Sequence, residues 1–213
     1  MASALGPVTS LIYWLGFSWR PASRAKTLAK ALPMGILFGW LWVFADDVGD
    51  SPIPFAVMFA WLGDIALSKD GDRWFLLGIG AFALAHVFLI AVFFDLGVEI
   101  GAARIGGMIA LVGLLGVMVP LLWRYAGDLR GPVMGYVAII FAMGIAGLMI
   151  ASGDTRVDQT VLLGLALFVL SDTLLALQAF VATPSPRLQI PLSLAVWPTY
   201  YLAMICFAAA APG

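Results

Sequence analysis

The sequence predicts an all-α integral membrane protein, with eight transmembrane helices in one domain that covers residues 1–213. Hydrophobic residues make up 63% of the chain and charged residues only 11%, with a mean hydropathy of +1.04. A soluble domain of this size needs a more polar surface. Apolar stretches of about 20 residues, the length that crosses a bilayer as a helix, recur along the chain. Strands of a membrane barrel would instead show short alternating segments.

The eight predicted spans are separated by brief connections that carry nearly every charged residue. The first span is short, and the seventh contains two hydroxyl groups and a carboxylate near its middle. In chain order, the predicted spans are 5–19, 27–45, 52–69, 74–94, 101–123, 132–151, 157–182 and 188–210.

The charges between the spans predict the orientation of the bundle. Eight spans leave four loops on the side opposite the two termini. These loops and the adjoining span ends hold nine of the eleven basic residues, which are Arg20, Arg24, Lys26, Lys30, Lys69, Arg73, Arg124, Arg130 and Arg187. The other side holds Arg104 and Arg156 together with seven acids, which are Asp46, Asp47, Asp50, Asp95, Glu99, Asp154 and Asp158. The positive-inside rule therefore places both termini outside the cytoplasm.

Several classes of function are excluded by what the chain lacks. One histidine, His86, and one cysteine, Cys206, rule out a multi-histidine metal site, a cysteine metal site and a disulfide framework within this chain. The formal net charge of −1 gives no indication of nucleic-acid binding. The N-terminus lacks a basic segment, so it is not interpreted as a cleaved signal peptide.

Two aspartates, Asp64 and Asp172, lie inside apolar segments, whereas the other ten acids lie in loops or at span ends. A carboxylate at mid-span costs about 2.5–3.5 kcal/mol on insertion scales, so its presence needs a reason. One reason is structural, because polar side chains hydrogen-bond between helices. At about 1.5 Å per residue, Asp64 lies roughly 7 Å and Asp172 roughly 15 Å from the cytoplasmic edge. A shared pocket that opens inward is therefore feasible.

The local sequences around the two aspartates resemble each other, with Gly63-Asp64-x-x-Leu67 in the third span and Ser171-Asp172-x-x-Leu175 in the seventh. These spans run in the same direction. A parallel 4+4 duplication would explain the resemblance. Chance similarity between two apolar helices is the simpler explanation.

Other polar side chains reach a similar depth. His86 shares a helix face with Phe82, and Tyr200 and Tyr201 lie in the last span. Each also has an ordinary explanation, as a core histidine bonded to a carbonyl or as aromatic packing. Lys26 and Lys30 share a face at the inner start of the second span, where lysines commonly extend to lipid phosphate, and Lys26 is interpreted in that way.

Two carboxylates in one apolar pocket suit acid–base catalysis. Burial and mutual repulsion favour a state in which one carboxyl is protonated and the other ionised, which supplies a general acid and a general base. Proton-relay transport uses the same groups, so the pair alone does not establish catalysis.

Five phrases, taken together and in order, resemble the lysoplasmalogenase (YhhN-like) family of eight-span membrane proteins. The resemblance runs from about residue 26 to residue 205. The phrases are KALPM at 30–34, LGDIAL at 62–67, FLLGIGAFALAH at 75–86, SDTLLAL at 171–177 and VWPTYYLA at 196–203.

The resemblance implies hydrolysis of the vinyl ether of a lysoplasmalogen to a fatty aldehyde and glycerophosphoethanolamine or glycerophosphocholine. It implies a lysophospholipid substrate, a membrane location and no metal or cofactor. Asp64 and Asp172 would be the catalytic pair, with the deeper Asp172 as the expected acid. Lys30, His86, Tyr200 and Tyr201 would contact the substrate, Lys30 through its phosphate. From the resemblance we expect other residues in many members: tyrosine near Leu89, asparagine near Gln178 and glutamine at Met204.

Two other classes of protein remain as alternatives to a hydrolase. A proton-coupled transporter or a non-catalytic lipid-binding protein would also bury aspartates, although the spans lack the mid-helix breaks of many transporters. An intramembrane aspartyl protease also uses two aspartates. Those enzymes carry Gly-x-Gly-Asp, whereas Trp61 occupies the position of the first glycine here.

Overall fold

The computed structural model describes residues 2–44, 51–99, 101, 104–182 and 185–211. Within them the chain folds into eight α-helices, and their described ends lie within four residues of the predicted spans when the π-helical turn Leu177–Val181 is counted with the seventh helix. The expected end of the second span at residue 45, and Asp46, Asp47 and Asp50, lie outside the described residues. The helices are α1 (Ala2–Phe17), α2 (Arg24–Phe44), α3 (Ile53–Leu67), α4 (Asp72–Leu96), α5 (Ile105–Tyr125), α6 (Arg130–Leu148), α7 (Thr155–Ala176) and α8 (Pro186–Ala210).

The all-α class is confirmed, and the described helices include five, α4 to α8, that are long and apolar enough to cross a membrane. Helices α1 and α3 are apolar but shorter. A bilayer crossing by all eight helices stays a prediction, as does the 4+4 duplication.

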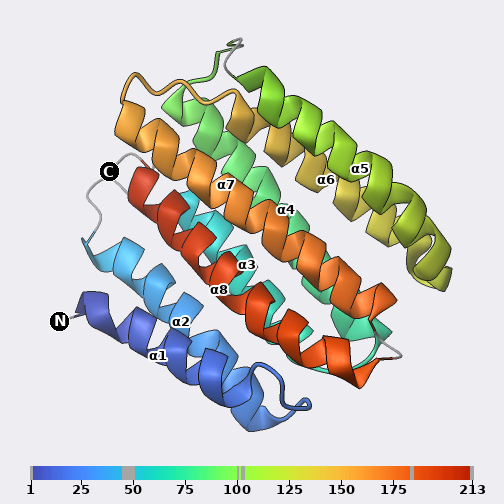
Figure 1. Cartoon of the computed structure of the whole chain (residues 1–213). Helices are drawn as coiled ribbons and strands as arrows, with labels where there is room; N and C mark the ends of the chain where they lie inside the picture. The colour runs from blue at the N-terminus through green and yellow to red at the C-terminus, as the bar shows by residue number, and fades with distance from the viewer. Residues whose placement is uncertain (1, 45–50, 100, 102–103, 183–184, 212–213) are drawn as a thin grey trace.

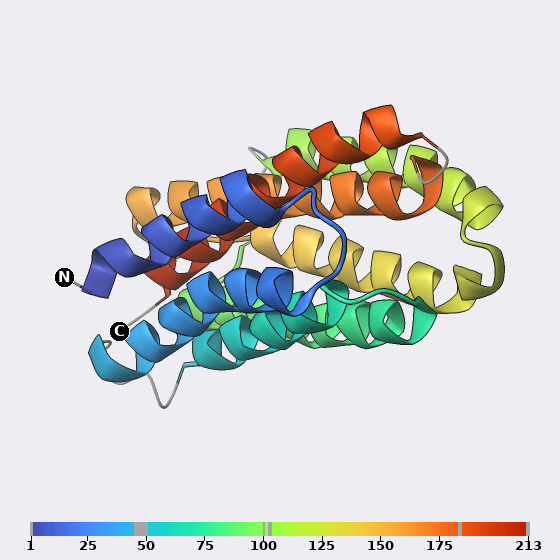
Figure 2. The same cartoon turned by 90° about the horizontal axis from the view of Figure 1, so that it is seen from below.

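The helices pack in two layers. Helices α1, α8 and α7 lie side by side in one layer and α2, α3 and α4 in the other, with α5 and α6 beyond α7 and α4 (Figures 1 and 2). The chain termini lie at one end of the bundle, and the α1–α2, α3–α4, α5–α6 and α7–α8 connections lie at the other (Figure 1). Nine of the eleven basic residues lie in these connections or in the helix ends that adjoin them, so the structure places that charge at one end.

Local sequence explains several helix ends. Asp154 precedes α7, and its carboxylate accepts hydrogen bonds from the backbone N–H groups of Arg156 and Val157, as an N-cap residue does. Gly71 separates α3 from α4 with a φ of 104°, a conformation that favours glycine. Helix α7 continues into a π-helical turn at Leu177–Val181, which widens the helix just beyond Asp172.

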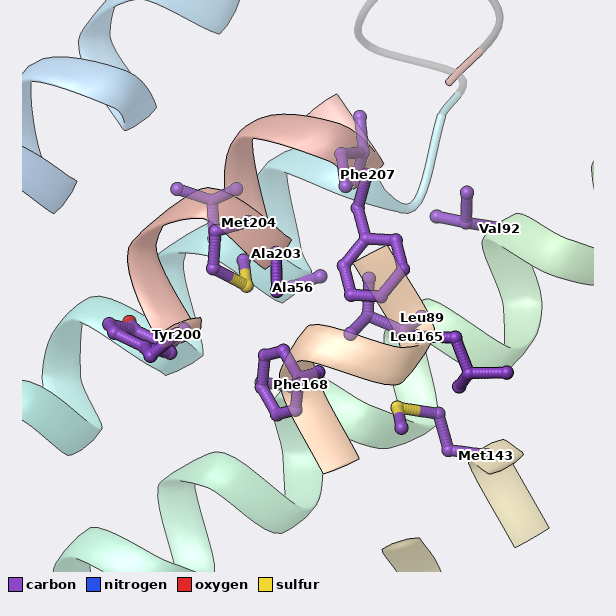
Figure 3. Packing of buried hydrophobic residues seen from close by; sticks show 14 of the residues in the cluster. Ala56, Leu89, Val92, Met143, Leu165, Phe168, Tyr200, Ala203, Met204 and Phe207 are labelled. Carbon is purple, nitrogen blue, oxygen red and sulfur yellow. The ribbon is translucent and has the colours of Figure 1, made fainter. Parts of the chain in front are cut away.

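The centre of the bundle is filled by buried apolar side chains. Phe168 of α7, Leu89 of α4 and Met204 and Phe207 of α8 are fully buried and meet there (Figure 3). Leu89 and Met204 are two of the positions where the resemblance leads us to expect polar residues. Their apolar side chains fit this apolar environment.

Helices α3 and α4 approach closely where glycine leaves room. A Cβ added at Gly78 would lie 2.5 Å from the Leu67 side chain, whereas one added at Gly80, on the same helix, would meet nothing within 4 Å. We therefore expect Gly78→Leu to destabilise the protein by about 1–3 kcal/mol through overpacking. Gly80→Leu should cost nothing measurable, because leucine favours a helix more than glycine does. Thermal unfolding in detergent measures both variants, and equal stability would contradict the close α3–α4 packing.

Candidate active site

Asp64 lies at the junction of α2, α3 and α8, and only 1% of its surface is exposed. The Tyr200 hydroxyl of α8 donates a hydrogen bond of 2.7 Å to Asp64 Oδ2. Lys30 Nζ of α2 lies 3.1 Å from Asp64 Oδ1. A buried charge is tolerated when it is paired and hydrogen-bonded, and both carboxylate oxygens have such a partner.

Asp172 lies on α7, and its hydrogen-bond partners differ from those of Asp64. His86 Nε2 of α4 lies 3.0 Å from Asp172 Oδ2, and the Tyr136 hydroxyl of α6 donates a hydrogen bond of 3.3 Å to the same oxygen. The sequence had not indicated Tyr136. The available signal was that it is the only residue with a polar side chain in the predicted span 132–151.

The hydrogen bond of the other ring nitrogen, Nδ1, determines which atom can donate a proton in the His86–Asp172 contact. Nδ1 faces the carbonyl oxygen of Phe82, which can only accept, so Nδ1 carries a proton and donates it. In a neutral imidazole, Nε2 is then an unprotonated acceptor. Nε2 lies 3.0 Å from Asp172 Oδ2, so a hydrogen bond between these atoms would use a proton held by either the carboxyl or the imidazole. The pair is therefore arranged to share a proton.

Both aspartates line a single cavity of about 430 Å³, with Lys30 and Tyr200. This volume falls in the range of small-molecule sites. The cavity reaches from the aspartates to Trp19, which is on the exposed connection between α1 and α2. A polar chamber thus joins the buried carboxylates to the basic end of the bundle.

An aromatic wall connects the two carboxylate clusters. Phe168 packs edge-on against His86, with ring centroids 4.9 Å apart, and also contacts Tyr200 at 5.9 Å. Phe82 packs edge-on against the other side of Tyr200 at 5.5 Å. These rings fix the side chains that hold Asp64 and Asp172.

Not every predicted site residue lines the chamber. His86 is fully buried behind Asp172 and reaches the site only through that carboxylate. Tyr201 stacks on Trp197 at 5.9 Å and lines a different cavity, near Gly6 and Ile36. The reason is helical geometry, because consecutive residues point about 100° apart. The structure therefore brings Tyr200 to the aspartates and turns Tyr201 away.

The two lysines of α2 both line the chamber. Lys30 pairs with Asp64, and its contact with a substrate phosphate stays a prediction. Lys26, expected to extend into lipid phosphate, instead lines the chamber and donates a hydrogen bond of 2.6 Å to the Arg20 carbonyl oxygen. Arg20 lines the same mouth. The sequence did not indicate that Arg20 and Lys26 lie together, because their proximity depends on how the α1–α2 connection folds.

Within the described residues, no group of three or more histidine, cysteine, aspartate or glutamate side chains is arranged to hold a metal ion. The arrangement offers one carboxylate paired with a cation, one carboxyl that shares a proton with histidine, and a polar space between them.

The fold and this arrangement define a class, a helical integral membrane protein with a buried carboxylate site. Residues 25–211 match the YhhN family, so the chain belongs to the YhhN family. It is similar to the Homo sapiens protein named Lysoplasmalogenase TMEM86A, with 30% identity over 209 residues that cover 91% of this chain and 82% of the human protein. No solved structure matches the chain.

Proposed function

We propose that this protein hydrolyses the vinyl ether of lysoplasmalogens to a fatty aldehyde and glycerophosphoethanolamine or glycerophosphocholine. Family membership and the relative named a lysoplasmalogenase support the reaction class. The observation that carries the proposal is that Asp64 and Asp172 face one chamber with different partners, Lys30 on one and His86 on the other. Such a difference separates an acid from a base.

In the proposed first step, Asp172 transfers its proton to the alkene carbon distal to the ether oxygen. The electron pair of the double bond forms the new C–H bond, and the positive charge is shared between the adjacent carbon and the ether oxygen. The Asp64 carboxylate stabilises this oxocarbenium ion. Preorganised charges of this kind act strongly in a site with little water.

In the second step, a water adds to the cationic carbon while the Asp172 carboxylate accepts its proton. The resulting hemiacetal then collapses: its hydroxyl oxygen forms the C=O bond and releases its proton, the bond to the glycerol oxygen breaks, and the glycerol oxygen gains a proton in exchange. The products are an aldehyde and a glycerophospholipid head group, and both carboxyl groups return to their starting states. Tyr200 and Tyr136 hold the two carboxylates through their hydroxyl groups. Arg20 and Lys26 at the chamber mouth supply positive charge for the substrate phosphate.

His86 is proposed as a positioning residue that shares the proton of Asp172. His86→Gln can still hydrogen-bond to Asp172 but cannot take up a proton at neutral pH. We expect kcat to fall about tenfold, less than the hundredfold or more that loss of a general acid costs. KM should stay within about twofold, because His86 does not line the chamber. A change in KM without a change in kcat would contradict the positioning role.

We also propose that all eight helices cross the membrane, with both termini outside the cytoplasm. In a Cys206→Ala background, Ser185→Cys in the α7–α8 connection should react with an impermeant maleimide only after the cells are opened. Thr155→Cys, at the opposite end of α7, should react in intact cells. Labelling of position 185 from outside an intact cell would contradict this orientation.

Purified protein in phosphatidylcholine vesicles provides the test of the reaction itself. Supplied with lysoplasmalogen, it should release fatty aldehyde and free head group in equal amounts. Transfer of intact lysolipid across the vesicle without aldehyde would indicate a transporter instead. Tight binding without either outcome would indicate a lipid-binding protein.

A further inference from the structure

The chamber adjoins a second cavity of different character. This second cavity, of about 60 Å³, lies between α5, α6 and α7 and is lined almost entirely by apolar side chains. Phe75, Asp172 and Leu175 line both cavities. Asp172 therefore stands where a polar chamber meets a narrow apolar space.

A third cavity extends this apolar space along the same helices. It measures about 240 Å³ and continues past Gly107, Gly144 and Leu162. Leu111, Leu114 and Val169 line both the second and the third cavity. The two apolar cavities together are called the α5–α7 groove.

We propose that the α5–α7 groove binds the aliphatic chain of the lysolipid and sets the chain length that the protein prefers. This inference rests on the proposed function. A vinyl ether joins a polar glycerol to an apolar chain, so its scissile bond lies at the polar–apolar boundary of the substrate. In the protein that boundary lies at Asp172, with the chamber on one side and the groove on the other.

The length of the groove fits a lipid chain. Asp172 and Leu162 lie ten residues apart on α7, which corresponds to about 15 Å at the rise of an α-helix. The hydrocarbon core of a bilayer is about 30 Å thick, so each leaflet contributes chains of about this length. A chain that begins at Asp172 and ends near Leu162 would contact apolar side chains of the groove along its whole length.

The other large apolar cavity does not fit this role. It lies between α1, α2 and α8, measures about 230 Å³ and is lined by Tyr201, Ile36 and Gly6 among others. It shares no lining residue with the chamber. A chain bound there would not pass either aspartate.

Photo-crosslinking tests the position of the chain without requiring turnover. The probe is a saturated ether lysophosphatidylethanolamine with a diazirine at the chain end, added to protein in phosphatidylcholine vesicles. We expect adducts on the segments 107–114, 144–148 and 162–169, and competition by unlabelled lysolipid. Uniform labelling of the lipid-facing surface, or adducts concentrated on α1, α2 and α8, would overturn the proposal.

A matched pair of variants sharpens the test. Ala166→Phe narrows the groove, whereas Ala142→Phe adds the same ring at an exposed position of α6 that lines none of these cavities. Each buried methylene strengthens binding about fourfold, so excluding two of them should cost about 15-fold. The ratio of kcat/KM for a 16-carbon chain to that for a 6-carbon chain should fall about 15-fold in Ala166→Phe and stay unchanged in Ala142→Phe.

The crosslinking experiment and the chain-length experiment together distinguish a failure of this inference from a failure of the proposed function. Competed groove adducts without any aldehyde release would refute the hydrolase and retain the chain site. Aldehyde release with an unchanged chain-length ratio in Ala166→Phe, or with adducts elsewhere, would refute the groove and retain the hydrolase.

Discussion

Asp172→Asn is expected to lower the rate of aldehyde release by at least about 10²-fold, the low end for loss of a general acid. Asparagine has nearly the shape of aspartate and can still accept a hydrogen bond from Tyr136, but it has no proton to give to carbon. The Asp172 side chain is 92% buried among packed helices. Another carboxyl group therefore has little freedom to move into its position. Steady-state assays on protein in vesicles measure the effect.

The control for this variant is Asp95→Asn, which makes the same chemical change at the exposed end of α4. It should retain the wild-type rate. Asp172→Asn should also unfold at nearly the wild-type temperature, which separates lost chemistry from lost structure. A rate near that of the wild type in a folded Asp172→Asn protein would make the aspartate a structural polar group.

Asp64→Asn should reduce the rate by a similar factor for a different reason. Without the carboxylate, nothing opposes the cationic charge that develops on the substrate, and Lys30 adds a repulsive positive charge nearby. The variant also leaves the Lys30 ammonium without its ion partner. Removing one member of a buried pair is destabilising, and we expect a loss of at least about 1 kcal/mol, or roughly 2–4 °C in Tm.

The double variant Asp64→Asn/Lys30→Met separates these two effects. It removes the unpaired charge, so it should recover most of the lost Tm. It should not recover the rate, because the carboxylate is still absent. Recovery of activity together with stability would show that Asp64 serves only to neutralise Lys30, and it would contradict the two-carboxylate mechanism.

Much of the fold follows from features that sequence carries directly. An apolar run long enough to cross a bilayer and a charged connection mark each helix, and the described helices lie where these features predict them. The burial of Asp64 and Asp172 also follows, because each sits inside such a run, and both are buried. We also expected the two aspartates to face one chamber. They do so because α3 and α7 both pack against α8.

The partners of the aspartates were harder to predict. Helix α6 is apolar on all sides, so no polar stripe distinguishes the face that carries Tyr136 from the face toward lipid. Lys30 is close enough to a helix end to extend to either water or a neighbouring helix. The choice depends on how α2 packs against α3, which a single sequence does not specify. The choice between Tyr200 and Tyr201 depends in the same way on the rotation of α8.

The central claim is that a carboxylic acid of this protein protonates the vinyl-ether carbon. The most direct measurement is product analysis in heavy water, with purified protein, lysoplasmalogen and immediate reduction of the aldehyde to an alcohol. Mass spectrometry should find one deuterium on the carbon next to the former aldehyde carbon, together with free glycerophospho head group, and Asp172→Asn should yield neither. Two results would contradict the account: recovery of only intact lysolipid from correctly folded protein, or aldehyde without deuterium at that carbon.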